Sequence, residues 1–152
     1  MNLSFLIFQL ANGLTEGMVL FIIASGLSLV FGVLRVINFA HGSLYMIGAY
    51  LAFTLSTLFS ELTLLPFILV MIAVPIGVGI VGWGLEVTLF RRIYRKEHLL
   101  QLLLTYALVL ILDDLVRLIW GGDIRNVPRP PLLAGSVDLV GLSFPSYNIF
   151  IL

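Results

Sequence analysis

The chain has 152 residues, no cysteine and a formal net charge of zero. Its residues are 61% hydrophobic and only 11% charged, and its mean hydropathy is +1.15. Soluble domains are about 45–50% apolar and about 25% charged, so the composition argues against a soluble domain and, without a basic face, against nucleic-acid binding. The absence of cysteine excludes disulfides and thiolate metal sites. The composition predicts an all-α, polytopic helical membrane protein.

Apolar stretches of spanning length recur along the chain. A helix needs roughly 20 apolar residues to cross about 30 Å of hydrocarbon. No basic residue precedes Arg35, so we expect no secretory signal peptide and a retained first span. The chain, 1–152, then forms one transmembrane domain of about four helices plus the beginning of a fifth. The expected spans are Leu14–Leu34, Leu44–Phe59, Leu64–Leu85 and Leu99–Trp120, and Phe144–Leu152 is typical of an unfinished fifth.

Basic residues predict the orientation of these spans. Cytoplasmic loops are rich in Lys and Arg, which assigns the loop 86–98 to the cytoplasm. Counting back, the loop with Arg35 is also cytoplasmic and the N-terminus is periplasmic. The loop Gly121–Ser143 then faces outward, where two aspartates offset its two arginines. The residues used are Arg91, Arg92, Arg95 and Lys96 in the loop 86–98, and Asp123, Arg125, Arg129 and Asp138 in the outer loop.

A polar break separates the first two spans. It comprises Ile37, Asn38, Phe39, Ala40, His41, Gly42 and Ser43. The second span is short, so part of this segment is expected at membrane depth as a broken-helix or re-entrant element near 37–43. Ser43 can cap the second helix, whose N-terminal dipole end would suit an anionic substrate group such as an amino-acid carboxylate. The alternative is a polar turn at the interface, with His41 bonded to a backbone carbonyl.

Small residues recur at helical spacing on three spans. Four-residue spacing stacks side chains on one helix face, where small residues let another backbone approach closely. Ordinary bundle packing and a pore lining both use such faces, and both stay open here. Pro75, inside the third span, predicts a kink, either fixed or flexible. The small residues are Ala24, Ser28, Gly32, Gly48, Ala52, Ala73 and Gly77.

Charged residues occur in the outer third of the fourth span. Asp113 and Arg117 are four residues apart, beside Asp114, so a pair on one helix face is expected. Pairing lowers the cost of a charge at membrane depth, and contact with substrate is the alternative role. Glu16 fits the first turn of the first span.

Catalytic patterns are not evident. The sequence has no phosphate-binding loop with its lysine, so ATP hydrolysis by this chain is not expected. His41 lacks a second ligand at metal spacing, and His41 with Ser43 is too little for a hydrolase. We expect a non-enzymatic membrane protein without cofactor or metal.

Several segments together resemble a known family. The stretch Gly26–Tyr50, which contains Asn38-Phe39-Ala40-His41-Gly42, is similar to the N-terminal signature of branched-chain amino acid ABC importer permeases of the "H" type. The segments Phe90–Arg95, Gln101–Tyr106 and Asp113–Gly121 are similar to that family's next stretch. The Asn-Phe-Ala-His-Gly block is the specific part of this likeness.

The resemblance implies a bacterial inner-membrane permease that works by alternating access. It implies a second, homologous permease subunit, two cytoplasmic ABC ATPases and a periplasmic substrate-binding protein as partners. It implies branched-chain or other small hydrophobic amino acids as cargo, with urea or short amides as alternatives. Asn38 and His41 are the residues expected to shape the pathway.

The length departs from that family. Its members are nearly twice as long, and their ATPase-coupling loop lies in the C-terminal half. The expectation is therefore an N-terminal half of a permease. A rival hypothesis is a small self-contained membrane subunit with a structural or assembly role.

Overall fold

The computed structural model describes residues 3–34, 38–59, 63–123, 125–127, 130–139 and 142–151. Its long helices are α1 (Leu3–Leu34), α2 (His41–Thr57), α3 (Leu64–Leu85) and α5 (His98–Trp120). Arg35 and Ile37, at the beginning of the expected break, lie outside these ranges, as does Arg129.

Three stretches of the described residues are long and apolar enough to cross a membrane. They are Phe5–Val33, Leu64–Ile93 and His98–Trp120. The fourth expected span, α2, has 17 residues, the lower end of spanning length. The protein is therefore a helical membrane protein, as its composition predicts.

Helical structure extends further than the sequence analysis expected at two places, before the first expected span and after the third. α1 begins eleven residues before Leu14, because Leu3–Gly13 is apolar and contains no proline. Glu16 consequently lies within α1 rather than in its first turn, which corrects that expectation. α3 ends at Leu85 as predicted, but the chain stays helical through a π-helix, Glu86–Phe90, and the short α4, Arg91–Ile93. The connection to α5 is therefore much shorter than the expected loop 86–98.

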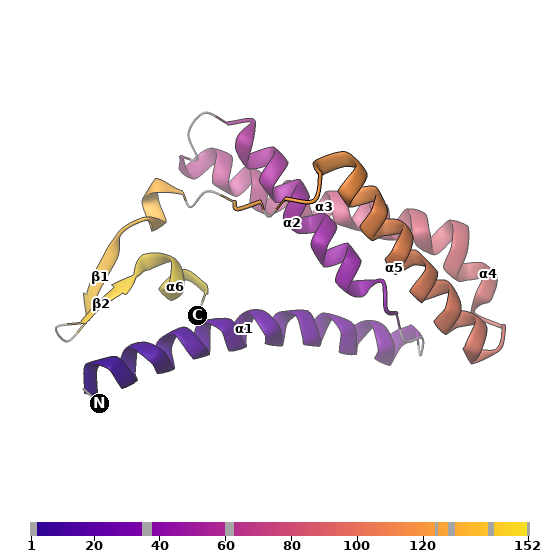
Figure 1. Cartoon of the computed structure of the whole chain (residues 1–152), viewed down its shortest axis with the longest axis horizontal. Coiled ribbons are helices and arrows are strands. Elements are labelled where there is room, and N and C mark those ends of the chain that lie inside the picture. The colour runs from indigo at the N-terminus through magenta and orange to yellow at the C-terminus, as the bar shows by residue number, and fades with distance from the viewer. Residues whose placement is uncertain are drawn as a thin grey trace.

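The helices α2, α3 and α5 pack together, and α1 lies to one side of them (Figure 1). α2 runs antiparallel to α3, because Leu44 near the beginning of α2 lines a cavity with Leu85 at the end of α3, while Ser56 near the end of α2 lines another with Phe67 near the beginning of α3. Consecutive spans of one chain point in opposite directions, and this arrangement agrees with that rule. A small core joins α2 to α3 and α5. Its buried members are Ala40, Phe90, Leu108 and Leu112.

The segment after α5 is more ordered than the expected polar loop. It contains a 3-10 helix, Pro131–Leu133, and a ribbon of two antiparallel strands, β1 (Ser136–Leu139) and β2 (Leu142–Pro145). Ser136 pairs with Pro145 and Leu139 pairs with Leu142. Within the expected fifth span, Phe144 and Pro145 belong to β2, and the helix α6 (Ser146–Ile151) follows and lies over the N-terminal half of α1 (Figure 1).

Side chains fasten this end of the chain to α1. The Asn148 amide donates a 2.9 Å hydrogen bond to Asn12, and the rings of Phe8 and Phe144 stack with centroids 6.3 Å apart. The Asn12 amide thereby has a polar partner on a largely apolar helix, where an unpartnered amide would be costly.

Candidate substrate pathway

The polar break forms a tight turn into α2. Oδ1 of Asn38 accepts a 3.0 Å hydrogen bond from the backbone N–H of Ala40. The Asn38 carbonyl accepts another from the backbone N–H of His41 at 3.2 Å. Asn38 thus bonds to the backbone two residues on, which is how asparagine stabilises turns. Ala40 is fully buried and is the N-cap of α2.

Ser43 lies in the first turn of α2 but does not cap it. The N-cap Ala40 makes no side-chain cap bond. The Ser43 hydroxyl instead donates a 3.1 Å hydrogen bond to Oδ1 of Asp113 on α5. The expected cap is therefore wrong, because the hydroxyl is drawn to a carboxylate on another helix. A carboxylate near a helix N-terminus is also favoured by the helix dipole.

The beginning of α2 lies beside the interior of α5, about two-thirds of the way along it. Asp113 follows the first residue of α5, His98, by 15 residues, and precedes the last, Trp120, by seven. At about 1.5 Å per residue, Ser43 is beside a point about 22 Å along α5. Ala40 packs against Leu108 and Leu112, which are also interior to α5. The Ser43 end of the break is therefore level with the interior of α5, whereas Asn38 shares a cavity with Tyr94, just beyond the end of the α3 span.

Two further contacts fix α2 against α5. The Trp120 indole N–H donates a 2.7 Å hydrogen bond to the Thr54 hydroxyl. The rings of Trp120 and Tyr50 lie 5.3 Å apart between centroids. Since Ser43 meets Asp113 and Thr54 meets Trp120, α2 and α5 run in the same direction. Neither contact was foreseen from the sequence, because the pairs are 66 or more residues apart.

A cleft of about 610 Å³ opens between α1, α2 and α3. His41 lies at its wall, and a side chain at Gly26 of α1 would meet the imidazole at 3.4 Å. Within the described residues, the imidazole makes no hydrogen bond, so the expected bond to a backbone carbonyl is not formed there. The rest of the wall is mainly apolar and includes Ile22, Tyr45, Gly48 and Pro75.

The remaining residues of the break have separate surroundings. Phe39 is about half exposed. Gly42 is exposed, and a Cβ there would meet nothing within 4 Å. Asn38 lines a smaller cavity of about 160 Å³ with Glu86 and Tyr94. The structure thus brings His41 to one cavity and Asn38 to another, on either side of the turn.

The small residues divide into two groups. Gly48 and Gly77 lie in the α2–α3 interface, where a Cβ at either would be 3.3 Å from the facing side chain. Ala52 lines a cavity shared with α3. The second group is exposed and consists of the small residues of α1 together with Ala73 of α3. The exposed members are Ala24, Ser28, Gly32 and Ala73.

The expected ion pair of the fourth span is not formed. Within the described residues, the ion pairs join Arg91 to Glu86 and Arg125 to Asp123. Asp113 is engaged by Ser43, and Asp114 and Arg117 are exposed. This corrects the expectation of an ion pair among the three.

Asp113 and Arg117 nonetheless share a cavity. It has a volume of about 360 Å³ and is also lined by Tyr50 of α2. Two opposite charges therefore border the same space without contacting each other, so the alternative role of these charges, contact with substrate, remains a prediction.

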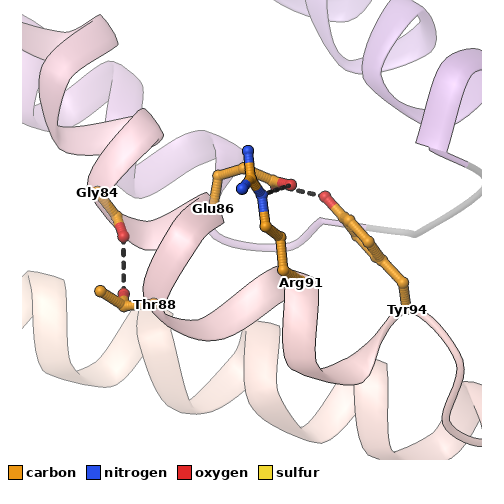
Figure 2. A network of polar contacts seen from close by, with 5 residues as sticks. All are labelled: Gly84, Glu86, Thr88, Arg91 and Tyr94. Carbon is orange, nitrogen blue, oxygen red and sulfur yellow. Dashed lines mark hydrogen bonds and ion pairs between the residues drawn. The ribbon is translucent and has the colours of Figure 1, made fainter.

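The π-helix carries a polar network that the sequence did not reveal (Figure 2). Glu86 accepts a hydrogen bond from the Tyr94 hydroxyl and lies 3.9 Å from Nε of Arg91. Burial, and then the bond to Glu86, raise the pKa of Tyr94, which follows the span, to about 12. The Thr88 hydroxyl donates to the Gly84 carbonyl at 2.7 Å. π-turns are frequent at functional sites, and this one places Phe90 against Ala40.

Comparisons with known proteins agree on one relationship. A family model described as "Branched-chain amino acid transport system / permease component" matches residues 9–152. The high-affinity branched-chain amino acid transport system permease protein BraD of Pseudomonas aeruginosa is 33% identical over 94% of this chain. The permease proteins LivH of Salmonella typhimurium and Escherichia coli K12 are 33% and 31% identical over 84% of it.

The chain spans about half the length of these relatives. The alignments cover 50% of BraD and 42% of each LivH. No solved structure matches the chain.

Proposed function

The chain belongs to the family of branched-chain amino acid transport system permease components, and we propose that it is the N-terminal half of such a permease. In this proposal it is the membrane-spanning part of an ABC importer in the bacterial inner membrane. It forms part of the translocation pathway, while partner subunits hydrolyse ATP. The N-terminus is periplasmic, and the end of α3 and the beginning of α5 are cytoplasmic.

The depth of the polar break carries this proposal. An irregular backbone within the hydrocarbon region is tolerated where it is buried in protein or lines a cavity. The turn satisfies both conditions, because Ala40 is fully buried and His41 lines the cleft. Transporters build their binding sites from such interrupted helices near the membrane midplane.

The cleft suits a small hydrophobic cargo. Its volume of about 610 Å³ is within the range of about 300–1,000 Å³ common for ligand pockets. The wall is mainly apolar, with His41 and Tyr45 as its polar side chains. The apolar wall suits the hydrocarbon side chain of a branched-chain amino acid, which urea lacks.

Asn38 and His41 have different roles in the proposal. Asn38 shapes the turn through its bond to the Ala40 N–H, and His41 presents its imidazole to the cargo from the wall of the cleft. Asn38 is therefore a positioning residue, whereas His41 is a contact residue.

The proposed partners follow from the family. They are a second, homologous permease, two cytoplasmic ABC ATPases and a periplasmic substrate-binding protein. The exposed small residues Ala24, Ser28 and Gly32 on α1 support a close approach by another helix. A second permease subunit is the occupant that we assign to that face.

Uptake of radiolabelled leucine tests the proposal. The permease is expressed with its transport partners, and initial rates are compared for His41→Leu, Asn38→Leu and wild type. We expect both variants to lose at least tenfold in rate while membrane insertion is unchanged. His98→Leu and Asn126→Leu, which change the same residue types outside the turn, are the matched controls and should keep wild-type rates. Normal uptake by both turn variants would remove the pathway role.

A further inference from the structure

A cluster of basic side chains lies between the third and fourth apolar helices. Four cations occur within six residues: Arg91, Arg92, Arg95 and Lys96. Arg91 is paired with Glu86 at 3.9 Å. Within the described residues the other three have no ion pair, and all three are exposed. Unpaired surface cations this dense attract an anion.

The buried amide of Gln101 holds this connection in one conformation. Gln101 is 6% exposed, and its Nε2 group lies 3.2 Å from the carbonyl oxygens of Ile93 and Lys96 and 3.4 Å from that of Tyr94. The amide nitrogen of one side chain thus contacts three backbone carbonyl oxygens of the turn that carries the cations. Tyr94 is also tied to Glu86 (Figure 2).

The turn lies where two spanning helices end. The apolar stretch of α3 continues to Ile93, and that of α5 begins at His98. Only four residues join them, Arg95 and Lys96 among these, and Arg92 lies in the last helical turn before them. The cations therefore lie at the edge of the hydrocarbon, at the level of lipid headgroups. Juxtamembrane clusters of four to eight Lys and Arg attract anionic lipid, by about 1 kcal/mol for each side chain, roughly a fivefold change in affinity.

We propose that Arg92, Arg95 and Lys96 bind the phosphate of an anionic phospholipid at this turn. Membrane orientation alone requires positive charge on the loop, but it does not require an ordered backbone. The contacts of the buried Gln101 amide with three backbone carbonyls are an added feature, which orders the backbone that carries the cations. A lipid bound there would hold the ends of α3 and α5 together in the membrane plane.

Lipid competition measures this site directly. The 152-residue chain is purified in detergent with equimolar phosphatidylglycerol and phosphatidylcholine, and native mass spectrometry counts the lipids that remain bound. We expect wild type to retain phosphatidylglycerol preferentially. Arg95→Gln should lower the preference by about fivefold, and Arg92→Gln/Arg95→Gln/Lys96→Gln should abolish it.

Arg125→Gln is the matched control, because it removes an exposed arginine from the opposite end of α5. It should retain the wild-type preference, and a circular dichroism spectrum checks that each variant stays helical. Equal retention of the two lipids by wild type would overturn the proposal and leave the cluster as a surface for an acidic protein. So would a preference that survives the triple variant, or one lost equally in Arg125→Gln.

Discussion

The Ser43 hydroxyl donates a 3.1 Å hydrogen bond to the Asp113 carboxylate and so joins the first turn of α2 to the interior of α5. Ser43 is 5% exposed, and Asp113 is partly buried. Removing the hydroxyl leaves a carboxylate without this donor. The contact thereby positions the polar turn, because Ser43 follows His41 by two residues.

Ser43→Ala should destabilise the chain by about 1–3 kcal/mol, the cost of leaving a buried polar group without its partner. Unfolding in increasing sodium dodecyl sulfate, followed by circular dichroism, measures the change. Ser28→Ala removes a hydroxyl from an exposed position of α1 and should change stability by less than about 0.5 kcal/mol. Equal effects of the two substitutions would contradict the importance assigned to the Ser43–Asp113 bond.

Gly48→Leu should separate α2 from α3. A Cβ at Gly48 would be 3.3 Å from Cγ2 of Val78, so a larger side chain must push the helices apart at a cost of about 1–3 kcal/mol. Gly48 also lines the cleft, so the substitution should lower leucine uptake. Gly79→Leu makes the same chemical change on the neighbouring helix α3, but a Cβ there meets nothing within 4 Å. It should leave stability unchanged or raise it slightly through better helix propensity.

Much of the helical pattern was predictable from the sequence, because an apolar stretch must form a helix in lipid. α3 ends at Leu85 and α5 ends at Trp120, as the residue pattern predicted. The short second apolar helix was also foreseen, and α2 has 17 residues. The π-helix was not foreseen, because Glu86–Phe90 has no proline or glycine to signal a change of winding.

The partners of polar side chains were the harder part. Helical spacing brought Asp113 and Arg117 to one face and predicted an ion pair, whereas Asp113 bonds to Ser43. Sequence spacing describes neighbours on one helix, but it does not say which helix lies opposite. The choice of Asp113 depends on the packing of α2 against α5, which periodicity alone does not define.

Tyr94 should titrate well above an ordinary tyrosine. Its pKa is raised to about 12 by burial and by the bond to Glu86, against about 10 for an unfolded chain. The folded state holds this proton more tightly, so the stability that Tyr94 contributes is complete below pH 10 and is lost as the pH rises toward 12. Tyrosinate absorbance near 295 nm is recorded for wild type and for Tyr94→Phe. The difference between the two titrations should be a single step near pH 12. A step near pH 10 would show that the hydroxyl is not held by Glu86.

Gln101→Leu should loosen the turn between α4 and α5. The substitution removes the amide nitrogen that contacts three backbone carbonyl oxygens, while the leucine side chain fills a similar volume. Hydrogen exchange followed by mass spectrometry should show faster exchange in 94–97, with 108–116 unchanged. Gln9→Leu, an exposed glutamine on α1, is the control and should not alter exchange in 94–97. Unchanged exchange there in Gln101→Leu would refute the proposed anchoring.

The central claim is that the polar turn lies within the membrane, beside the interior of α5. The chain has no cysteine, so single spin labels are introduced through Gly42→Cys, which has open space, and through Lys96→Cys at the basic turn. Electron paramagnetic resonance power saturation in lipid nanodiscs measures the depth of each label. The structure predicts that the label at 42 is more than about 10 Å deeper than the label at 96, from the helical rise along α5. Two labels at the same headgroup depth would contradict the account.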